Sequence, residues 1–453
     1  MKAPRGLPRS RSQAFLESGS RRRHIVILVE NLPVPLDRRV WLESLALENA
    51  GYKVSVISPC PAHELATPFR VLENIHLYRY PMPAPTRGRL SFFREFSYCL
   101  WQTDRLLKRI WREDPFDVIQ TCNPPDMFWL IARHYKKKGC RFVFDQHDLC
   151  PELYESKFKR RDILHRGLCW MERMQYDTAE AVIATNDSYR EIAITRGRKR
   201  PEDVVVVRSG PMLERFRPTL RDESLLRGHE HLVVYVGVMG PQDGVDYALR
   251  AVRHFLDTGG ANDALFAFLG SGDSLESLIA LSKQLRIEDH VVFTGWAYDS
   301  DLRRYLSTAS VGIAPDPKTP LNDVSTMNKI VDYMAMSVPI VSFDLTESRR
   351  SAGEAAVYVA NDDEREMALA IRELLSDDAR RSRMGRIGRE RVETSLAWEH
   401  GQIALVDFYD RLLGQPSFRH TSGMTQASLN ALAESSWRAS TSDLEAGRRG
   451  VSR

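Results

Sequence analysis

The chain has 453 residues, with 64 Lys and Arg against 60 Asp and Glu, and a hydrophobic fraction of 43%. These are ordinary globular values, so they exclude wholesale disorder, and a net charge of +4 is too small to indicate a nucleic-acid-binding protein. The six cysteines form no CxxC pair and no zinc-type spacing, which favours a reduced, cytoplasmic setting. The sequence has no run of 18 apolar residues and therefore no predicted membrane span.

Both ends of the chain have the composition of tails. Residues 1–23 are basic and lack the apolar stretch of a secretory signal. We expect a flexible basic tail there, outside the chemistry and suited to contact with anionic lipid. Residues 415–453 are rich in Ser, Ala and Arg with little apolar periodicity, and we expect them to be disordered.

The ordered chain opens with residues 24–29, an apolar run typical of a buried parallel strand. A polar loop follows, then a helix over 39–50 and a strand over 53–58. Strand, helix and strand in this order predict a right-handed βαβ unit and an α/β fold. The alternation continues with strands at 118–120, 142–145, 181–184 and 204–207 and a helix at 127–138.

A second α/β series begins with the apolar run at 232–237. Its further strands are predicted at 265–269, 291–294, 311–314, 339–342 and 356–359. The sequence thus predicts two doubly wound, Rossmann-like domains facing a central cleft. They cover residues 24–210 and 229–400, with a linker at 211–228 and a terminal helix at 401–414 that packs back on the cleft. Because ligands of open parallel sheets bind beyond the carboxyl ends of the strands, we expect the functional residues on the loops after each strand.

One loop of the first domain has an unusual concentration of polar groups. It directly follows the strand at 142–145 and places His147 among three carboxylates, those of Asp145, Asp148 and Glu152. An imidazole beside carboxylates is suited to orienting a sugar hydroxyl or to stabilising charge near a reacting carbon. The alternative is structural, with Asp148 as a helix cap and His147 as a satisfied histidine.

Two other loops of the first domain have weaker signals. Residues 123–126 are a predicted turn in which Asp126 caps the following helix. Before the first helix, Asp37 is a predicted N-cap, and Arg38 or Arg39 is placed to face the cleft. A surface arginine in an ion pair is the alternative.

Two loops of the second domain are rich in glycine. Gly237 opens the segment 237–244, which also holds Gln242, and Gly270 begins a Gly-Ser-Gly turn. Glycines after a strand let the backbone approach a phosphate, but the spacing matches neither a P-loop nor GxGxxG. Dinucleotide binding is therefore disfavoured.

The segment 316–335 has the richest set of binding residues. Ser325 or Thr326 is the predicted N-cap of a helix. The N–H groups at the start of that helix and the Lys329 ammonium form a predicted diphosphate cradle, and Asp332 is placed to accept hydrogen bonds from a ribose diol. The alternative is an ordinary capped helix with an exposed Lys–Asp pair.

A further helix is predicted over 92–113. Its apolar residues include Phe92, Phe93 and Trp111, and they are interleaved with five basic residues. A basic and aromatic amphipathic helix is suited to a membrane interface, and a plain core-facing helix is the alternative. In the first case we expect a lipid-linked acceptor and a protein peripheral to the cytoplasmic membrane.

Taken together and in order, motifs over residues 24–414 resemble those of the retaining family-4 glycosyltransferases of GT-B fold, of the bacterial type that assembles surface polysaccharides. The matching stretches include Asp37-Arg-Arg-Val-Trp41, Asp145-Gln-His-Asp-Leu149, Val207-Arg-Ser-Gly-Pro211, Phe293-Thr-Gly-Trp296 and Asn328-Lys-Ile-Val-Asp-Tyr-Met-Ala335. The set is specific to this family, although no single motif is.

The resemblance implies that the C-terminal domain binds a nucleotide-diphospho-sugar and the N-terminal domain binds a lipid-linked or saccharide acceptor. It implies no metal and no cofactor, and we expect a UDP-sugar as the donor. The implied catalytic residues are His147, near the reacting end of the donor sugar, and Lys329, the cation for the phosphates. The implied donor-binding residues are Gly237, Gln242, Gly270, Ser325, Thr326, Met327, Asn328, Lys329 and Asp332. The implied acceptor-side residues are Arg38, Arg39, Asp126, Asp148 and Glu152.

The chain departs from the family pattern at three positions. Val324 stands where the first acid of the Glu-x7-Glu signature is expected, with Asp323 beside it, and Met239 and Gln242 lie near the positions of the family's usual Arg and Lys. Our leading hypothesis is sugar transfer with retention, in exopolysaccharide, capsule or O-antigen synthesis. The alternatives are a non-catalytic GT-B scaffold and a nucleotide-sugar epimerase.

Overall fold

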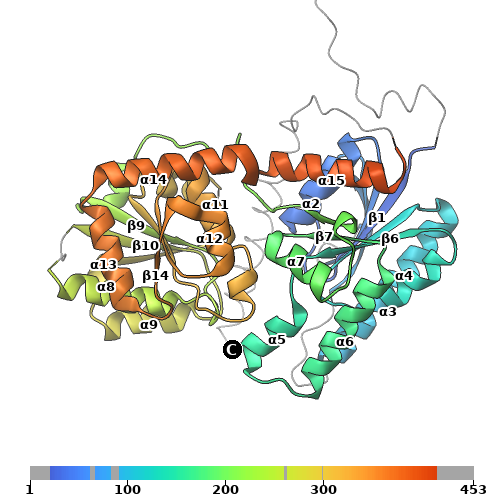
Figure 1. The fold of residues 1–453 in the computed structure, drawn as a ribbon, viewed down its shortest axis with the longest axis horizontal. Coiled ribbons are helices and arrows are strands. Elements are labelled where there is room, and N and C mark those ends of the chain that lie inside the picture. Colours follow the sequence, from blue (N-terminus) through green and yellow to red (C-terminus); the bar gives the residue numbers. More distant parts are fainter. Residues whose placement is uncertain (1–20, 62–66, 83–90, 260–262, 298, 416–453) are drawn as a thin grey trace, which may run out of the picture. The chain divides into compact units, whose positions relative to one another are not determined.

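The computed structural model describes residues 21–61, 67–82, 91–259, 263–297 and 299–415 (Figure 1). The chain divides into two compact units. The first consists of Met1–Pro151, Arg161–Val207 and Gln402–Arg453, and the second of Glu152–Arg160 and Arg208–Gly401. The predicted tails fall almost entirely outside the described residues, except that Arg22 and Arg23 pair with Glu48 and Asp117 and so belong to the first unit.

The first unit is built on an eight-stranded sheet of order β3-β4-β2-β1-β5-β6-β7-β8. All neighbouring strands are parallel except β3 and β4, which are antiparallel. The strands are β1 (His24–Leu28), β2 (Lys53–Cys60), β3 (Phe69–Leu72), β4 (Ile75–Pro81), β5 (Val118–Cys122), β6 (Arg141–Gln146), β7 (Ala181–Ala184) and β8 (Val204–Val206). The helices between them are α2 (Arg38–Asn49), α3 (Ser91–Glu113), α4 (Trp129–Lys136), α5 (Cys150–Phe158), α6 (Ile163–Thr178), α7 (Asp187–Thr195) and the short η2 (Pro201–Asp203).

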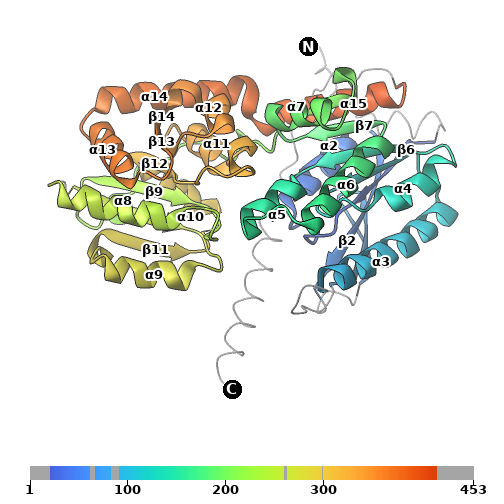
Figure 2. The same ribbon diagram turned by 60° about the horizontal axis from the view of Figure 1, so that its bottom comes forward.

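The direction of each crossover decides which face of this sheet a helix covers. The chain moves from β1 to β2 in one direction along the sheet, and from β4 to β5, β5 to β6 and β6 to β7 in the other. Because parallel crossovers are right-handed, α2 covers one face, and α3, α4 and α6 cover the opposite one. Figure 1 and Figure 2 both show these last three helices grouped together.

The second unit is built on a six-stranded, wholly parallel sheet of order β11-β10-β9-β12-β13-β14. Its strands are β9 (His231–Val236), β10 (Ala264–Leu269), β11 (Val291–Gly295), β12 (Val311–Ala314), β13 (Ile340–Phe343) and β14 (Ala356–Val359). Its α-helices are α8 (Val245–Asp257), α9 (Leu275–Gln284), α10 (Asp299–Thr308), α11 (Asn328–Ala335), α12 (Thr346–Ala352), α13 (Glu364–Leu375) and α14 (Asp378–Arg391). Short turns are η3 (Glu223–Leu226), η4 (Glu288–His290), η5 (Asn322–Val324), η6 (Gly353–Ala355) and η7 (Val392–Leu396), and α15 (Trp398–Leu412) ends the described chain.

The position of strand β9 in the middle of the sheet explains its continuous apolar run, because the side chains on both of its faces are buried. Val233 and Tyr235 lie in one buried cluster, and Leu232 and Val234 lie in another. Because successive side chains of a strand point to opposite faces, both faces of this sheet are covered. The strand therefore has no solvent-facing positions that would require polar residues.

The predicted α/β fold with two doubly wound domains is confirmed, and every strand predicted from an apolar run is present within two residues of its predicted bounds. Strands β3 and β4 were not predicted. The segment 211–228, predicted as a linker, belongs to the second unit and contains η3. Within the described residues, none of the helices combines the length and the apolarity that crossing a membrane requires.

Candidate functional site

One candidate site lies in the first unit, at the carboxyl ends of β5 and β6. The two strands are parallel, with Cys122 opposite Asp145 in their register. Gln120 lies two residues before Cys122 and so points to the same face of the sheet. The Gln120 amide donates to Asp145 Oδ2 at 2.9 Å and to Glu43 Oε2, on α2, at 2.7 Å. A polar cluster is therefore built into a face that is otherwise apolar core.

Arg39 is the cation at the centre of this cluster. Its Nη2 lies 3.0 Å from Asp145 Oδ1 and 3.0 Å from Glu43 Oε1, and its Nη1 donates to the Val207 carbonyl at 2.7 Å. Its Nε lies 3.1 Å from His147 Nε2, which in turn lies 2.9 Å from Asp145 Oδ2. Of the two arginines left open by the sequence, Arg39 is buried against His147, and Arg38 is exposed.

The charges in this cluster shift one another's protonation. Burial, together with the neighbouring Asp145, raises the pKa of Glu43 to about 8 in spite of the opposing charges of Arg39 and His147. Burial alone would raise the pKa of Asp145, but Arg39 and His147 outweigh it and hold that pKa well below its usual value. Burial alone would lower the pKa of His147, but the charge and hydrogen bond of Asp145 outweigh it and raise that pKa. The two buried carboxyl groups are thus in different protonation states near neutral pH.

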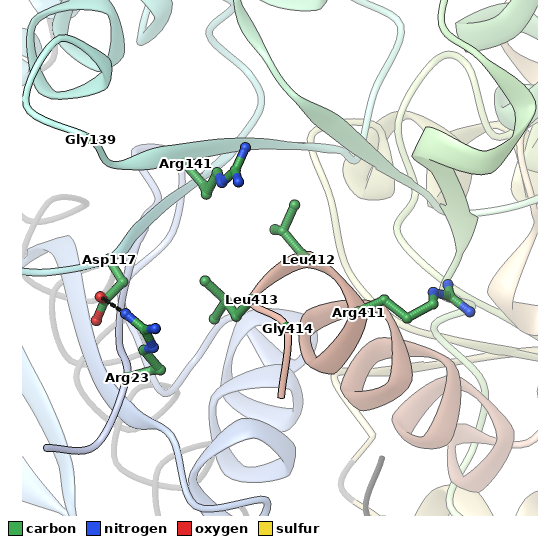
Figure 3. Close-up of a pocket in the computed structure, with 8 residues that line it drawn as sticks. All are labelled: Arg23, Asp117, Gly139, Arg141, Arg411, Leu412, Leu413 and Gly414. Carbon is green, nitrogen blue, oxygen red and sulfur yellow. Dashed lines mark hydrogen bonds and ion pairs between the residues drawn. The ribbon is translucent and has the colours of Figure 1, made fainter. Parts of the chain in front are cut away.

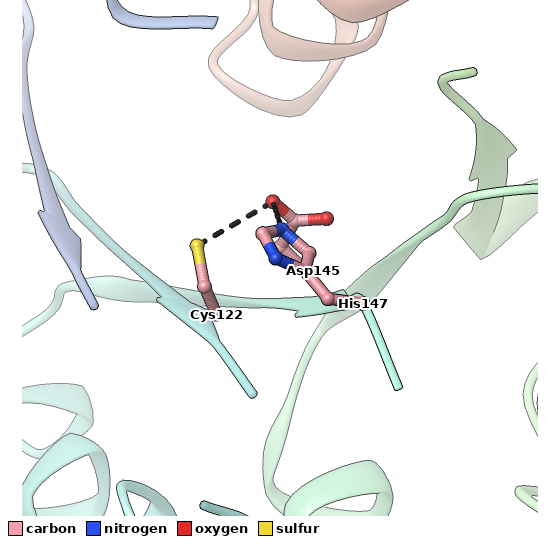
Figure 4. A group of neighbouring side chains, drawn as sticks. All are labelled: Cys122, Asp145 and His147. Carbon is pink, nitrogen blue, oxygen red and sulfur yellow. Dashed lines mark hydrogen bonds and ion pairs between the residues drawn. The ribbon is translucent and has the colours of Figure 1, made fainter. Parts of the chain in front are cut away.

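Cys122, Asp145 and His147 also lie close enough to be considered as metal ligands (Figure 4). The Asp145 carboxylate lies between the Cys122 thiol, at 3.5 Å, and the His147 ring. Arg39 already contacts Asp145 and His147, so a metal ion would add a second cation against a permanent one. Burial raises the pKa of Cys122 well above its usual value, so its thiol is neutral. We interpret the group as a hydrogen-bonded cluster rather than a metal site.

Asn123 fixes the loop that carries His147. Its side-chain oxygen accepts from the backbone N–H groups of His147 at 2.7 Å and Asp148 at 3.1 Å. Its amide donates to the Asp148 carbonyl at 2.7 Å and to Asp126 Oδ1 at 3.0 Å. The predicted helix cap by Asp126 is wrong, because α4 begins at Trp129 without a side-chain cap. Asp126 is instead buried beside Asn123, and burial raises its pKa to about 6.

The remaining acceptor-side candidates are only partly assembled. Asp148 and Glu152 are half-buried, and burial raises the pKa of Asp148. Glu152 lies on α5, in the segment grouped with the second unit. The predicted cap by Asp37 is confirmed, because its carboxylate accepts from the Val40 N–H at 3.1 Å.

A separate candidate site lies in the second unit, at the carboxyl ends of β9, β10 and β12. The Gly237 and Gly270 backbones are in such close contact that a Cβ on Gly270 would lie 1.8 Å from the Gly237 carbonyl oxygen. Gly270 also has φ +139°, which disfavours any side chain. Asn322 donates to the Gln242 carbonyl at 3.0 Å and so ties the loop before α11 to the glycine-rich loop. Glycine thus serves loop packing here.

Lys329 lies in the first turn of α11, and its ammonium is buried at 8% exposure. Nζ lies 2.5 Å from Asp316 Oδ1 and 5.2 Å from the centre of the Tyr235 ring. Burial alone would lower the pKa of Lys329, but Asp316 and then Asp243 outweigh it and raise that pKa. The ammonium is therefore charged, and it lies next to Gly237 at the end of β9.

The start of α11 differs from the prediction. Met327 is the N-cap and provides no side-chain cap bond, whereas Ser325 and Thr326 lie before it and Ser325 donates to the Leu321 carbonyl. The cap assigned to Ser325 or Thr326 is therefore wrong, and the side chain of the N-cap residue Met327 makes no cap bond to the first turn. Asn328 is exposed and Asp332 is half-buried on the same helix.

The structure shows the surroundings of Met239, Gln242 and Val324, the three positions at which the sequence departs from the family pattern. Met239 is buried in the apolar core of the second unit and so is not a phosphate contact, whereas Gln242 is exposed. Asp323, next to Val324, accepts from the Thr346 N–H at 2.9 Å and from its hydroxyl at 3.1 Å. Asp323 therefore anchors the start of α12, and it does not replace the missing acid.

Sequence reasoning did not identify Glu43, Gln120, Tyr409 and Asp316 as site residues. Gln120 is a polar residue inside the buried strand β5, and Asp316 is the second residue after the buried strand β12. A polar residue at such a position is a signal from which a site residue could have been predicted. Glu43 and Tyr409 lie inside amphipathic helices, where a polar residue has no distinguishing local pattern.

A cavity of about 470 Å³ occurs elsewhere in the first unit (Figure 3). It lies at the amino ends of β5 and β6, between Arg23, Asp117, Arg141 and the last turn of α15. His147 follows the carboxyl end of β6, where ligands of open parallel sheets bind, so this cavity lies at the other end of the strands and is separate from the His147 site.

Comparison with known families covers most of the chain. Residues 37–215 match the model described as Glycosyltransferase Family 4, and residues 230–377 match the model described as Glycosyl transferases group 1. The matches include His147 in the first unit and Lys329 in the second.

Individual relatives are distant. The chain is 26% identical to alpha-maltose-1-phosphate synthase of Mycolicibacterium smegmatis, over 60% of this chain and 74% of that protein. It is 28% identical to D-inositol 3-phosphate glycosyltransferase of Mycobacterium marinum, over 54% of this chain and 52% of that protein. It is also 28% identical to the lipopolysaccharide core biosynthesis glycosyltransferase LpsE of Rhizobium meliloti, over 32% of this chain and 40% of that protein.

Solved structures share the fold at low sequence identity. Sucrose-phosphate synthase of Thermosynechococcus elongatus has a TM-score of 0.72 at 19% identity, covering 87% of this chain and 100% of that one. HepE of Anabaena, in complex with UDP, has a TM-score of 0.65 at 12% identity, covering 86% and 99%. With both family models matched in order and both sheets of the GT-B fold present, the chain belongs to the family-4 glycosyltransferases of GT-B fold.

Proposed function

We propose that this glycosyltransferase moves a sugar from a nucleotide-diphospho-sugar to a lipid-linked or saccharide acceptor, with retention at the anomeric carbon, in the synthesis of a bacterial surface polysaccharide. The observation that carries the proposal is the charged Lys329 ammonium beside an uncapped helix start and the Gly237 backbone. Positive charge and free N–H groups at one point are the donors that a diphosphate requires.

In this proposal the second unit binds the donor. Lys329 and the first-turn N–H groups of α11 stabilise the charge that grows on the leaving diphosphate, and Asp332 holds the ribose. His147 stabilises the donor sugar near its reacting carbon, and the acceptor hydroxyl gives its proton to a departing phosphate oxygen. No step requires a metal ion, because Lys329 and the helix start supply the neutralising charge.

A UDP-sugar is the proposed donor. The Anabaena HepE structures that share this fold contain UDP or UDP-glucose. This supports a uridine nucleotide for the present chain only by analogy of fold, so the base is left to experiment.

A lipid-linked acceptor is favoured by the outer surface of α3, α4 and α6 in the first unit. Trp101 on α3 is 57% exposed, Trp170 on α6 is 56% exposed, and Ile163 at the start of α6 is 82% exposed. Arg105 stacks on Trp101, and α4 contains Arg133 and Lys136 but no acidic residue. Exposed aromatic residues beside basic ones fit the headgroup region of an anionic membrane.

We propose that this surface, which we call the α3–α6 face, rests on the inner face of the cell membrane. The side chains of Phe92 and Phe93, predicted to contribute, lie outside the described residues.

The test of the reaction uses the full chain with each of several UDP-, GDP- and ADP-sugars, with and without a bacterial lipid extract as acceptor. Transfer gives a new glycolipid whose anomeric proton has the configuration of the donor. A new sugar epimer formed from donor alone would instead favour the epimerase alternative. Turnover of none of these donors by folded protein would favour the non-catalytic scaffold.

A further inference from the structure

The buried cluster beneath His147 contains more ionisable groups than the proposed reaction uses. Two carboxyl groups, those of Glu43 and Asp145, lie at 0% exposure beside one arginine and one histidine. Arg39 Nη2 lies 3.0 Å from one oxygen of each carboxyl group, and the Gln120 amide donates to the other oxygen of each, so both groups surround the same two donors. Two buried carboxyl groups beside one permanent cation favour one proton on the pair. A buried carboxyl pair that shares a proton stores that proton inside the protein.

The contacts of His147 Nε2 indicate where this proton can go. Nε2 lies 2.9 Å from Asp145 Oδ2 and 3.1 Å from Arg39 Nε. An Nε2 that bears hydrogen donates to Asp145, and a bare Nε2 accepts from Arg39, so only one of the two contacts is a hydrogen bond at a time. In the described part of the chain, Nδ1 of this ring makes no hydrogen bond, so it is the nitrogen left for a ligand.

We propose that Glu43 is a positioning residue that holds a proton in the resting protein and transfers it, through Asp145, to His147 Nε2. In the resting state Glu43 is neutral and His147 is neutral, with hydrogen on Nδ1 and Nε2 accepting from Arg39. In the other state the proton has moved from Glu43 to Asp145 and from Asp145 to Nε2. Both carboxylates are then ionised and the ring is cationic.

The two states have the same net charge. In the first, Arg39 balances Asp145, and in the second, Arg39 and the imidazolium balance Glu43 and Asp145. No proton is exchanged with solvent and no electron is transferred, so burial does not prevent the change. The pKa values of Glu43 and His147 are both raised, so each of the two groups is able to hold the proton.

The neighbours of Glu43 do not compete for this proton. Burial raises the pKa values of the Cys122 thiol and the Tyr409 hydroxyl well above their usual values, so both stay neutral. Tyr409 donates to Gln120 Oε1 at 2.6 Å, which orients the Gln120 amide toward both carboxyl groups. The charged and titratable groups facing the pair are Asp37 and Arg39 from α2 and its cap, Cys122 from β5, His147 after β6, and Tyr409 from α15.

The consequence concerns the Nδ1–H group. It is a donor in both states, and it is a stronger donor when the ring is cationic. Negative charge that develops on a bound ligand therefore draws the proton from Glu43 onto the ring. This role of His147 rests on the proposed function, but the location of the proton does not, and it is measured without any substrate.

The experiment is a nitrogen-15 NMR titration of the full chain labelled at histidine, from about pH 5 to pH 9, with the His147 signals assigned by a His147→Asn variant. Wild type is expected to titrate His147 in two steps, because the ring shares its second proton with Glu43 between them. Glu43→Gln keeps the shape and removes the proton site, so it is expected to give one step. Glu48→Gln is the matched control: it removes a buried carboxylate from the same helix, one that pairs with Arg22, and is expected to keep two steps.

A single identical step in wild type and Glu43→Gln would overturn the proposal. If Glu43→Gln does not fold, infrared difference spectra of wild type labelled with carbon-13 glutamate decide the question. A protonated glutamate carboxyl at pH 7 that ionises near pH 8 is expected, and its absence would overturn the proposal equally. Asp126 is not labelled in this experiment. Glu30 is a second buried glutamate whose pKa burial raises, so its signal is assigned by a Glu30→Gln variant.

Discussion

Arg39 and Asp145 form a buried ion pair, 3.0 Å between Nη2 and Oδ1, that joins helix α2 to strand β6, which precedes the His147 loop. The arginine also contacts Glu43 and His147. Because a buried charge is costly without its partner, this pair fixes both the protonation of the cluster and the position of the histidine.

Removing the arginine is therefore expected to destabilise the first unit strongly. Arg39→Ala leaves Asp145 buried without its cation, and we expect a loss of about 3–5 kcal/mol in the free energy of unfolding. Urea unfolding followed by tryptophan fluorescence measures it. Arg38→Ala, which removes the exposed neighbour on the same helix, is the control and is expected to change the value by no more than about 0.5 kcal/mol. Equal losses in the two variants would contradict the assignment of Arg39.

The raised pKa of Glu43, about 8, predicts how stability depends on pH. Between the unfolded pKa of about 4.3 and the folded value, the folded chain holds a proton that the unfolded chain has lost. The free energy of unfolding from this group is therefore greatest below about pH 4.3 and falls as pH rises toward 8, by at most about 1.4 kcal/mol per pH unit.

Comparison of wild type with Glu43→Gln tests this dependence. Urea unfolding at pH 5, 6, 7, 8 and 9 is expected to show a downward slope in wild type that is shallower in the variant. Part of the slope above pH 6.5 remains in the variant, because the pKa of His147 is also raised on folding. An identical slope in both proteins would show that Glu43 is ionised at neutral pH.

Lys329 is expected to be required for turnover. Lys329→Met removes the ammonium that lies beside Gly237, and we expect the transfer rate to fall on the order of 10²-fold or more, as for other electrostatic donors to a developing anion. Lys318→Met, on the exposed part of the loop before α11, is the matched control and is expected to keep near wild-type activity. Wild-type turnover by Lys329→Met would remove Lys329 from the mechanism.

The α3–α6 face is expected to bind anionic membranes. In cosedimentation with phosphatidylcholine vesicles that contain phosphatidylglycerol, a Trp101→Ala and Trp170→Ala double variant is expected to bind on the order of tenfold more weakly than wild type, because it loses two exposed aromatic side chains that the membrane interface would bury. Trp296→Ala removes an equally exposed tryptophan of the second unit and serves as the control. Binding that is the same with and without the anionic lipid, or unaffected by the double variant, would contradict this surface.

All strands except β3 and β4 could be predicted, because the strands that cross the core, such as β1 and β9, are short apolar runs between polar loops. Strand β3 escaped prediction because it lies at the sheet edge and its four residues are largely exposed, so no apolar run marks it. The position of His147 after β6 followed from the sequence, because loop residues after a strand are local to it.

The partners of the site residues could not be predicted in the same way. Glu43, Gln120 and Tyr409 meet from two helices and a strand that are far apart in the sequence, and only the fold brings them together. Asp316 is the second residue after β12 and so was visible in the sequence, but its pairing with Lys329 depends on the path of the loop between them. The predicted N-caps of α4 and α11 were wrong for a related reason. The Asp126 carboxylate accepts from the Asn123 amide, and the Ser325 hydroxyl donates to the Leu321 carbonyl, so each side chain bonds to a different partner than the predicted helix start.

The central claim is that the second unit binds a nucleotide diphosphate without metal, and calorimetric titration of the purified chain with UDP, GDP and ADP, in the presence of a metal chelator, tests it most directly. We expect saturable binding of one diphosphate, UDP, and weaker binding by Lys329→Met. Binding of GDP or ADP in place of UDP would keep the site and change the donor. Binding of none of the three by folded protein would contradict the account.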